Sequence, residues 1–309
     1  MAIQDLWVEK HRPSKMADYV WIDSNQKNMV ESWIRDKSIP HLLLSGGAGT
    51  GKTTLAKVLI NELDVESADV LVINASRNNS VDDVRGKITN FGQTMPFGEF
   101  KIILLDEADY LSPNAQAALR GVMEQYQHVL RFIITCNYPD KIIPAIHSRC
   151  QGFNFRNLDE TEFMVRVGSI LGQEGIEFDV ETLIAFTKAH YPDLRKTINQ
   201  VQQCSTSGKL VMPEGNDDVG KDYRLEMVTL FRQGKKREAR DLICSQINLD
   251  EYQGMYKFLY RNLDFFGATN DEKDEALFII RQGLINHGLI ADPEINLSAT
   301  MTLLEQIGK

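Results

Sequence analysis

Cysteine is scarce in this chain of 309 residues, and the four that are present form no metal-binding pair. Cys136, Cys150, Cys204 and Cys244 lack the C-x-x-C spacing of a zinc module, so we expect reduced thiols in a cytoplasmic protein. No apolar run is long enough to span a membrane, and Met1–Asp5 shows no basic region followed by an apolar one. The sequence therefore predicts neither a signal peptide nor a membrane partner.

Positive charge is also in short supply, because 43 acidic residues outnumber 34 lysines and arginines and give a formal net charge of −9. This balance argues against a protein that is coated with nucleic acid over its whole surface. Binding to DNA would need a few placed basic groups, helped by neighbouring subunits. The length predicts two or three domains, and the apolar fraction of 43% is ordinary for a globular protein.

The most informative feature that the chain does have is a complete G-x-x-x-x-G-K-[ST] pattern, typical of a phosphate-binding loop. Its glycines let backbone N–H groups point at phosphate oxygens, and Lys52 can reach the β- and γ-phosphates. The Thr53 hydroxyl can hold Mg²⁺. The expected ATP-binding residues here are Gly46, Gly47, Ala48, Gly49, Thr50, Gly51, Lys52, Thr53 and Thr54.

Short apolar runs alternate with helical patterns over the first half of the chain. The expected strands are His41–Ser45, Asp69–Asn74, Lys101–Asp106, Arg131–Cys136 and Gly152–Phe155. This rhythm predicts an α/β domain over residues 1–156, with a parallel sheet covered by helices on both faces. The nucleotide is expected at the carboxyl ends of the strands.

No strand pattern follows Phe155, and the rest of the sequence is helical in pattern. We expect a small helical domain over residues 157–208 and a second all-helical domain over residues 221–309. Residues 208–220, rich in Gly, Pro, Asn and Asp, are typical of a linker. The helices expected in the small domain are Asp159–Gln173, Val180–His190 and Asp193–Ser205.

Two carboxylates end the expected strand Lys101–Asp106, beside the place where the phosphates should lie. Asp106 can organise Mg²⁺ through its water shell, and Glu107 can orient or activate an attacking water. A strand that ends in acidic residues is common. After a phosphate-binding loop in the same α/β rhythm, this ending indicates nucleotide hydrolysis.

Three further residues fit the same chemistry, each with an ordinary alternative. Asn137 can contact the γ-phosphate if its strand lies between the other two, but it could also simply begin a turn. Arg149 carries a permanent planar charge that can reach another protomer's phosphate, although most arginines lie at the surface without such a role. Arg195, early in a helix that Asp193 can cap, could fold over the nucleotide or remain a solvated charge.

Taken together, the motifs resemble those of the AAA+ clamp-loader ATPases of DNA replication over essentially the full length. The segment Trp7–Pro13 is W-V-E-K-H-R-P, similar to the family's W-V-E-K-Y-R-P box with His11 in place of Tyr. The segments Asp106–Asp109, Ala115–Arg120 and Asn137–Cys150 match as well. The resemblance implies an AAA+ phosphate-loop sheet domain, a helical lid domain, and a helical collar that holds subunits in a ring.

The resemblance also implies roles for single residues, with ATP and Mg²⁺ as cofactors. Asn137 and Arg195 would be the two nucleotide sensors, and Arg149 would complete the site of a neighbouring subunit. Val8 and Arg12 would line the adenine side. In relatives, two helix starts track the DNA backbone, so sequence-neutral phosphate contacts are expected. The expected DNA-binding residues are Arg77, Ser80, Arg85, Asn114 and Arg120.

The loop before the second phosphate-site strand is a candidate docking site for a partner. In relatives this region, here Phe91–Gly98, binds the sliding clamp, so Met95 and Phe97 are expected to contact it unless they pack into the local core. The other expected partners are primer–template DNA, further copies of this chain and a small clamp-loader subunit, in a pentamer. No membrane partner is expected.

Two segments distinguish branches of the family. Tyr191–Thr197 is similar to the large ATPase subunit of T4-type phage loaders, and Asn74–Gly86 departs from the N-A-S-D-E-R-G pattern of cellular replication factor C small subunits. This favours a phage protein of the host cytoplasm. The alternatives are an archaeal-like replication factor C small subunit, a scaffold that binds ATP without hydrolysing it, and another AAA+ machine such as a branch-migration helicase.

Overall fold

The computed structural model divides the chain into two compact units. The first consists of Met1–Asp179 and His190–Leu210, and the second of Val180–Ala189 and Val211–Lys309. The division into three domains at residues 156/157 and 208/221 stays a prediction. The residues described are 6–77, 81–155, 158–206, 208–212, 223–249 and 251–307, with the backbone alone described at 81–83 and 206.

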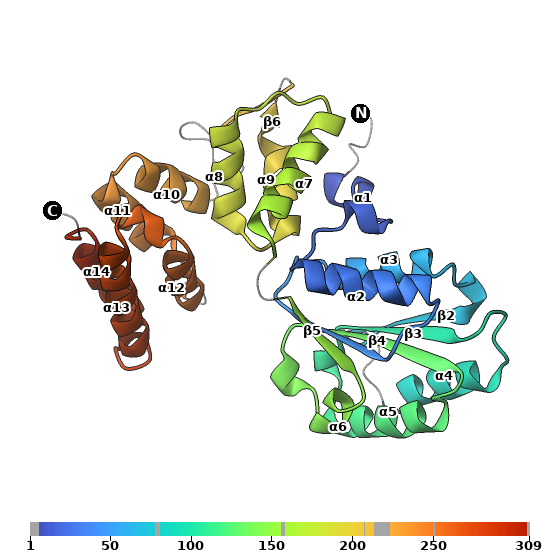
Figure 1. Ribbon diagram of the computed structural model, residues 1–309. Coiled ribbons are helices and arrows are strands. Elements are labelled where there is room, and N and C mark those ends of the chain that lie inside the picture. The colour runs from blue at the N-terminus through green and yellow to red at the C-terminus, as the bar shows by residue number, and fades with distance from the viewer. Residues whose placement is uncertain are drawn as a thin grey trace. The chain divides into compact units, whose positions relative to one another are not determined.

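The first unit is built on a parallel five-stranded sheet in the order β2-β3-β4-β1-β5 (Figure 1). All five expected strands are present, with ends shifted by at most one residue. Because β4 lies between β3 and β1, the condition set for Asn137 is met. The strands are β1 (Leu42–Gly46), β2 (Val70–Asn74), β3 (Lys101–Asp106), β4 (Leu130–Cys136) and β5 (Gln151–Phe155).

Helices cover both faces of this sheet, as an alternating α/β sequence requires (Figure 1). On one face lie α2 (Ser24–Arg35) and α3 (Lys52–Glu62). On the other lie α4 (Val81–Gln93), α5 (Pro113–Gln125) and the short α6 (Pro144–His147). Four short 3₁₀ helices connect these elements: η1 (Met16–Asp18), η2 (Ser67–Asp69), η3 (Ala108–Tyr110) and η4 (Pro139–Lys141).

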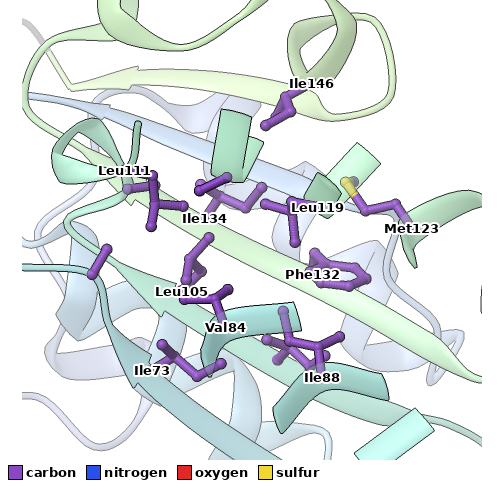
Figure 2. Packing of buried hydrophobic residues seen from close by; sticks show 14 of the residues in the cluster. Ile73, Val84, Ile88, Leu105, Leu111, Leu119, Met123, Phe132, Ile134 and Ile146 are labelled. Atoms are coloured by element: carbon purple, nitrogen blue, oxygen red, sulfur yellow. The ribbon is translucent and has the colours of Figure 1, made fainter. Parts of the chain in front are cut away.

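A hydrophobic core fills the space between the sheet and the helices α4, α5 and α6. The central strands are apolar on both faces because helices cover both, which is why their sequences are continuous apolar runs. Phe132 of β4 is completely buried in this core. Figure 2 labels its neighbours in the cluster, among them Ile73, Val84, Ile88, Leu105, Leu119, Met123, Ile134 and Ile146.

The first unit also contains α1 (Trp7–Lys10), α7 (Glu160–Gln173) and α9 (Leu194–Cys204). The expectation that strands end at Phe155 is wrong in one detail. Ser205–Thr206 (β6) and Lys209–Leu210 (β7) form a small antiparallel hairpin at the start of the expected linker. Two-residue strands are too short to show an alternating pattern, so they could not be predicted from the sequence.

The second unit is entirely helical in its described part. The helices of its core pack so closely at Gly283 that no side chain fits there. A Cβ at this position would lie 2.4 Å from Thr300 Oγ1 and 2.8 Å from a ring carbon of Tyr256. Asn296 Nδ2 donates to Tyr256 Oη (2.7 Å) beside it. No helix in the described residues is long and apolar enough to cross a membrane. The helices are α8 (Val180–His190), α10 (Tyr223–Arg232), α11 (Lys236–Gln246), α12 (Tyr252–Arg261), η5 (Leu263–Phe265), α13 (Asn270–His287) and α14 (Pro293–Leu304).

The buried position of Phe132 yields a stability prediction for the first unit alone. Phe132→Ala should lower the free energy of unfolding of this unit by about 3–5 kcal/mol, because it removes a buried ring and leaves a cavity. All three tryptophans, Trp7, Trp21 and Trp33, lie in the first unit, so tryptophan fluorescence during denaturation reports on it selectively. The control Val72→Ala, at a side chain that is 59% exposed, should change stability little. Equal effects of the two substitutions would contradict the packing described here.

Candidate functional site

The phosphate-binding loop joins the end of β1 to the start of α3. Gly49 (φ 71°) and Gly51 (φ 90°) adopt left-handed conformations that favour glycine. Lys52 is the first residue of α3, and its buried side chain donates hydrogen bonds from Nζ to the carbonyl oxygens of Gly46 (2.9 Å) and Gly47 (2.6 Å). The loop therefore curls around the lysine ammonium.

Asp106, at the end of β3, is hydrogen-bonded to two neighbouring elements. Its Oδ1 accepts a hydrogen bond from Thr53 Oγ1 (2.8 Å) in α3 and another from Thr135 Oγ1 (2.5 Å) in β4. Burial lowers the pKa of Lys52, and the charge of Asp106 opposes that shift. The carboxylate, the loop lysine and the loop threonine therefore form one electrostatic unit.

Glu107, the next residue, has an unusual backbone conformation that its neighbours hold in place. Its φ of 59° and ψ of 42° lie in the left-handed region, which is uncommon for a residue other than glycine. The Glu107 N–H donates to Thr135 Oγ1 (3.0 Å), so one hydroxyl contacts both acidic residues. Glu107 Oε2 accepts from Asn74 Nδ2 (3.5 Å) at the end of β2.

Sequence reasoning missed Thr135 and Asn74. Both are polar residues at or near the carboxyl end of an apolar strand, which is the signal that selected Asn137. Thr135 is 1% exposed, so its hydroxyl needs partners inside the protein, and it finds them in Asp106 and Glu107. The same signal applied to every strand would have identified both residues.

The start of α9 lies against the phosphate-binding loop. Leu194 N–H donates to the carbonyl oxygen of Gly49 (3.2 Å). The Asp193 carboxylate caps α9 by accepting from Lys196 N–H (2.9 Å), and it lies so close to Gly49 that a Cβ there would be 1.7 Å from its Oδ1. Burial raises the pKa of Asp193. The start of α9 and the phosphate-binding loop are therefore in direct contact.

One pocket brings together the segments expected to bind ATP. Val8 and Arg12 of the N-terminal segment line it, as do Gly49–Thr54 of the loop and Leu194 and Arg195 of α9. The residues expected on the adenine side and the expected sensor Arg195 therefore share a pocket with the loop. Whether they bind nucleotide stays a prediction.

The oxygen atoms at the end of the loop fit Mg²⁺. The hydroxyl of Thr53 and the carboxylate of Asp106 lie 2.8 Å apart, and Mg²⁺ in nucleotide sites takes one or two such groups together with waters and phosphates. No group of three or more His, Cys, Asp and Glu residues in the described part of the chain could hold a metal by itself. Bound phosphates and water would therefore have to supply the remaining ligands.

Asn137 and Arg149 occupy different surroundings. The Asn137 N–H, directly after β4, donates to Asp109 Oδ1 (3.2 Å), which places this residue at the strand end between the two phosphate elements. Arg149, beyond α6, instead lines a separate hollow with His41 and Gln151. The described residues that line the loop pocket do not include Arg149.

The residues expected to contact DNA are exposed where they are described. Arg77 follows β2, Arg85 lies in α4, and Asn114 and Arg120 lie in α5, all with exposed side chains. The helices α4 and α5 lie on the same face of the sheet (Figure 1). Ser80 lies outside the described residues.

The loop between α4 and β3 presents two apolar side chains to solvent. Met95 is 88% exposed and Phe97 is 80% exposed, so the alternative that they pack into the local core is wrong. Two buried residues hold the loop and the end of the helix before it: Asp69 Oδ2 accepts from Phe97 N–H (2.7 Å) in the middle of the loop, and Lys101 Nζ donates to the carbonyl oxygen of Phe91 (3.1 Å) in α4. Neither contact could be predicted from the sequence.

Comparison with known proteins gives relatives of nearly the same length. Replication factor C small subunits from Sulfurisphaera tokodaii and Picrophilus torridus are 34% and 36% identical to this chain; the first match covers 98% of this chain and 96% of the relative, and the second covers 98% of each. The chain belongs to the replication factor C small-subunit family. Residues 42–158 also match the AAA family, "ATPase family associated with various cellular activities". This member of the replication factor C family therefore carries an AAA+ ATPase domain around the loop described above.

Solved structures show the same fold at much lower identity. The RuvB Holliday junction branch migration motor of Thermotoga maritima matches with a TM-score of 0.58 and 13% identity over 92% of this chain and 90% of its own. At this identity the likeness concerns the fold alone. The relatives found by sequence fit the archaeal-like alternative better than the phage branch that Tyr191–Thr197 favoured.

The contact between Gly49 and Asp193 yields a prediction about nucleotide binding. Gly49→Ala should weaken ATP binding by about tenfold or more, because it forces a left-handed conformation on alanine and displaces the Asp193 carboxylate. A titration with a fluorescent ATP analogue measures this loss. Gly47→Ala is the matched control in the same loop, since its Cβ would meet only Thr50 Cγ2, at 3.9 Å. If Gly49→Ala binds ATP as tightly as the unaltered chain, the contact with Asp193 has no influence on binding.

Proposed function

We propose that this chain is an ATPase subunit of a sliding-clamp loader, which uses ATP binding and hydrolysis to open the clamp and place it on primer–template DNA. Membership of the replication factor C small-subunit family supports this function. The observation that carries it is the separation of Arg149, which lines a different hollow, from the pocket that Lys52, Thr53 and Arg195 line. An arginine held away from the pocket of its own chain can serve the pocket of a neighbouring subunit in a ring of ATPases.

The residues of the chain divide the hydrolysis step between them. The loop N–H groups and Lys52 bind and orient the triphosphate. Thr53 and Asp106 would hold Mg²⁺, which would neutralise charge on the phosphate oxygens. Glu107 orients a water for attack on the γ-phosphorus and accepts its proton. Asn137 lies where it can position that water, and Arg195 reports the state of the nucleotide to the lid.

The proposed partners correspond to separate surfaces. Arg77, Arg85, Asn114 and Arg120 would contact DNA phosphates, which gives binding that is independent of sequence and weakened by salt. Met95 and Phe97 would dock on the clamp. The collar role of the C-terminal helices is supported by exposed apolar side chains of α13 and α14, which are Phe278, Leu284, Ile285, Ile295 and Leu303.

A pentamer with further copies of this chain and a small clamp-loader subunit completes the proposal. An origin in a phage, with a place in the host cytoplasm, rests on the segments Tyr191–Thr197 and Asn74–Gly86 and stays a prediction. The archaeal relatives support the cellular alternative.

Mixed assemblies test whether the nucleotide site is shared between subunits. Arg149→Ala should keep ATP binding but lose at least about tenfold in hydrolysis with clamp and primed DNA present, because the transition-state charge is no longer stabilised. Glu107→Gln should also be inactive, because the water is no longer activated. A mixture of the two variants should regain part of the activity, since an intact Glu107 can then face an intact Arg149 from its neighbour. Steady-state release of phosphate gives all three rates.

Two results would contradict this mechanism. If the mixture stays as inactive as its components while both variants assemble, Arg149 acts within its own chain. If the wild type is as slow as Glu107→Gln, the chain is an ATP-binding scaffold. Strand unwinding without clamp loading would favour a helicase.

The exposed loop yields a separate prediction about the clamp. Replacing both Met95 and Phe97 by serine should weaken clamp binding by about tenfold or more, because each apolar side chain that would be buried contributes about 1.5–3 kcal/mol. ATP affinity should not change, since the loop lies at the amino-terminal edge of the sheet. Val165→Ser, at a side chain in α7 that is 64% exposed, is the control. Undiminished clamp binding in the double variant would place the docking surface elsewhere.

A further inference from the structure

A single carboxylate in α5 contacts two arginines that were assigned to different partners. Glu124 lies at the end of this helix and is half-exposed. Its Oε1 accepts a hydrogen bond from Arg120 Nε (3.3 Å), one helical turn earlier, and forms a short contact with Arg149 Nη2. The residue expected to meet DNA and the residue expected to meet a neighbour's ATP therefore share one oxygen atom.

The guanidinium of Arg149 is engaged entirely by its own chain in this arrangement. Its Nη1 donates to the carbonyl oxygen of Ala145 (2.7 Å) and to Ser148 Oγ (3.3 Å), and its Nη2 donates to Glu124. The hydrogen bond from Arg149 also lowers the pKa of Glu124, so the carboxylate stays ionised at neutral pH. The positive charge of the arginine is therefore neutralised while it rests here.

A neutralised arginine is poorly suited to the step proposed for it. Arg149 stabilises phosphoryl transfer by bringing positive charge to phosphate oxygens, and an adjacent carboxylate opposes this through its own negative charge. The side chain of Arg149 is 30% exposed and that of Glu124 is 47% exposed, so solvent reaches the pair and a stronger anion can replace the carboxylate.

We propose that Glu124 is a latch that holds Arg149 on its own subunit until the triphosphate of a neighbouring subunit takes its place. This rests on the proposed role of Arg149 in trans. The latch would suppress hydrolysis in loosely assembled subunits, where the neighbouring phosphate is not yet in position. Glu124 thus acts through Arg149 and touches no substrate.

The shared oxygen also determines whether loss of Arg120 would raise or lower the rate of ATP hydrolysis. Because Arg120 and Arg149 share the charge of Glu124, removing Arg120 leaves the carboxylate to Arg149 alone and strengthens the latch. Binding of a DNA phosphate by Arg120 would do the same. DNA that binds Arg120 would therefore not release Arg149 from Glu124. Any stimulation of hydrolysis by DNA would have to act through other residues.

The test measures hydrolysis of ATP by the full chain assembled with the clamp, in the absence of DNA and at fixed salt. Glu124→Gln keeps the shape of the side chain but removes its charge, and should raise this basal rate by about two- to fivefold, as expected for loss of one exposed ion pair. ATP affinity should stay unchanged. Glu31→Gln is the control, because Glu31 is an exposed glutamate of α2 that forms no ion pair with the described residues.

A double variant separates the latch from a general effect of charge. In the Arg149→Ala background, Glu124→Gln should produce no rise, because nothing remains to be released. Arg120→Gln alone should lower the basal rate. A fall in the rate of Glu124→Gln would mean that the carboxylate orients Arg149 productively, and an unchanged rate would mean that the contact is without consequence; either overturns the latch. If Arg149→Ala hydrolyses ATP normally, it is the proposed shared site that fails.

Discussion

The two hydrogen bonds accepted by Asp106 Oδ1 hold the nucleotide site together. Thr53 donates from the helix that follows the phosphate loop, and Thr135 donates from the neighbouring strand. Through them α3, β3 and β4 meet at one atom, and the Thr135 hydroxyl also accepts from the Glu107 backbone. Thr135 is buried and Asp106 is half-buried, so an arrangement without these hydrogen bonds would leave the Thr135 hydroxyl with no partner inside the protein. The positions of the expected metal ligands and of the expected general base are therefore set by the same contacts.

The polarity of the parallel sheet separates the proposed functions in space. The phosphate loop, the two acidic residues and Asn137 all follow strands, so they gather at the carboxyl edge. The loop with Met95 and Phe97 precedes β3 and therefore lies at the opposite edge. Because every strand of the sheet points the same way, the surface proposed for a partner and the site proposed for catalysis lie at opposite edges. Substitutions at one edge therefore need not disturb the other.

Much of the fold could be predicted because its signals are strong and local. Short runs with apolar residues marked all five strands to within a residue, and the glycine pattern marked the loop between β1 and α3. What escaped prediction depends on contacts between distant parts of the chain. The hydroxyl of Thr135 matters only because β4 lies beside β3, and Asp193 meets Gly49 only because α9 packs on the loop. The hairpin at Ser205–Leu210 is too short to have a periodicity.

The anchored loop between α4 and β3 has a consequence for association. The side chains of Asp69 and Lys101 are 0% and 2% exposed, and they form hydrogen bonds with the backbone of this loop and of the helix before it. The side chains of Met95 and Phe97 remain in solvent. A segment ordered before it meets a partner does not lose its backbone entropy at that moment, so more of the interaction energy is expressed as affinity. Such a preorganised tip can bind a partner with comparatively little buried surface.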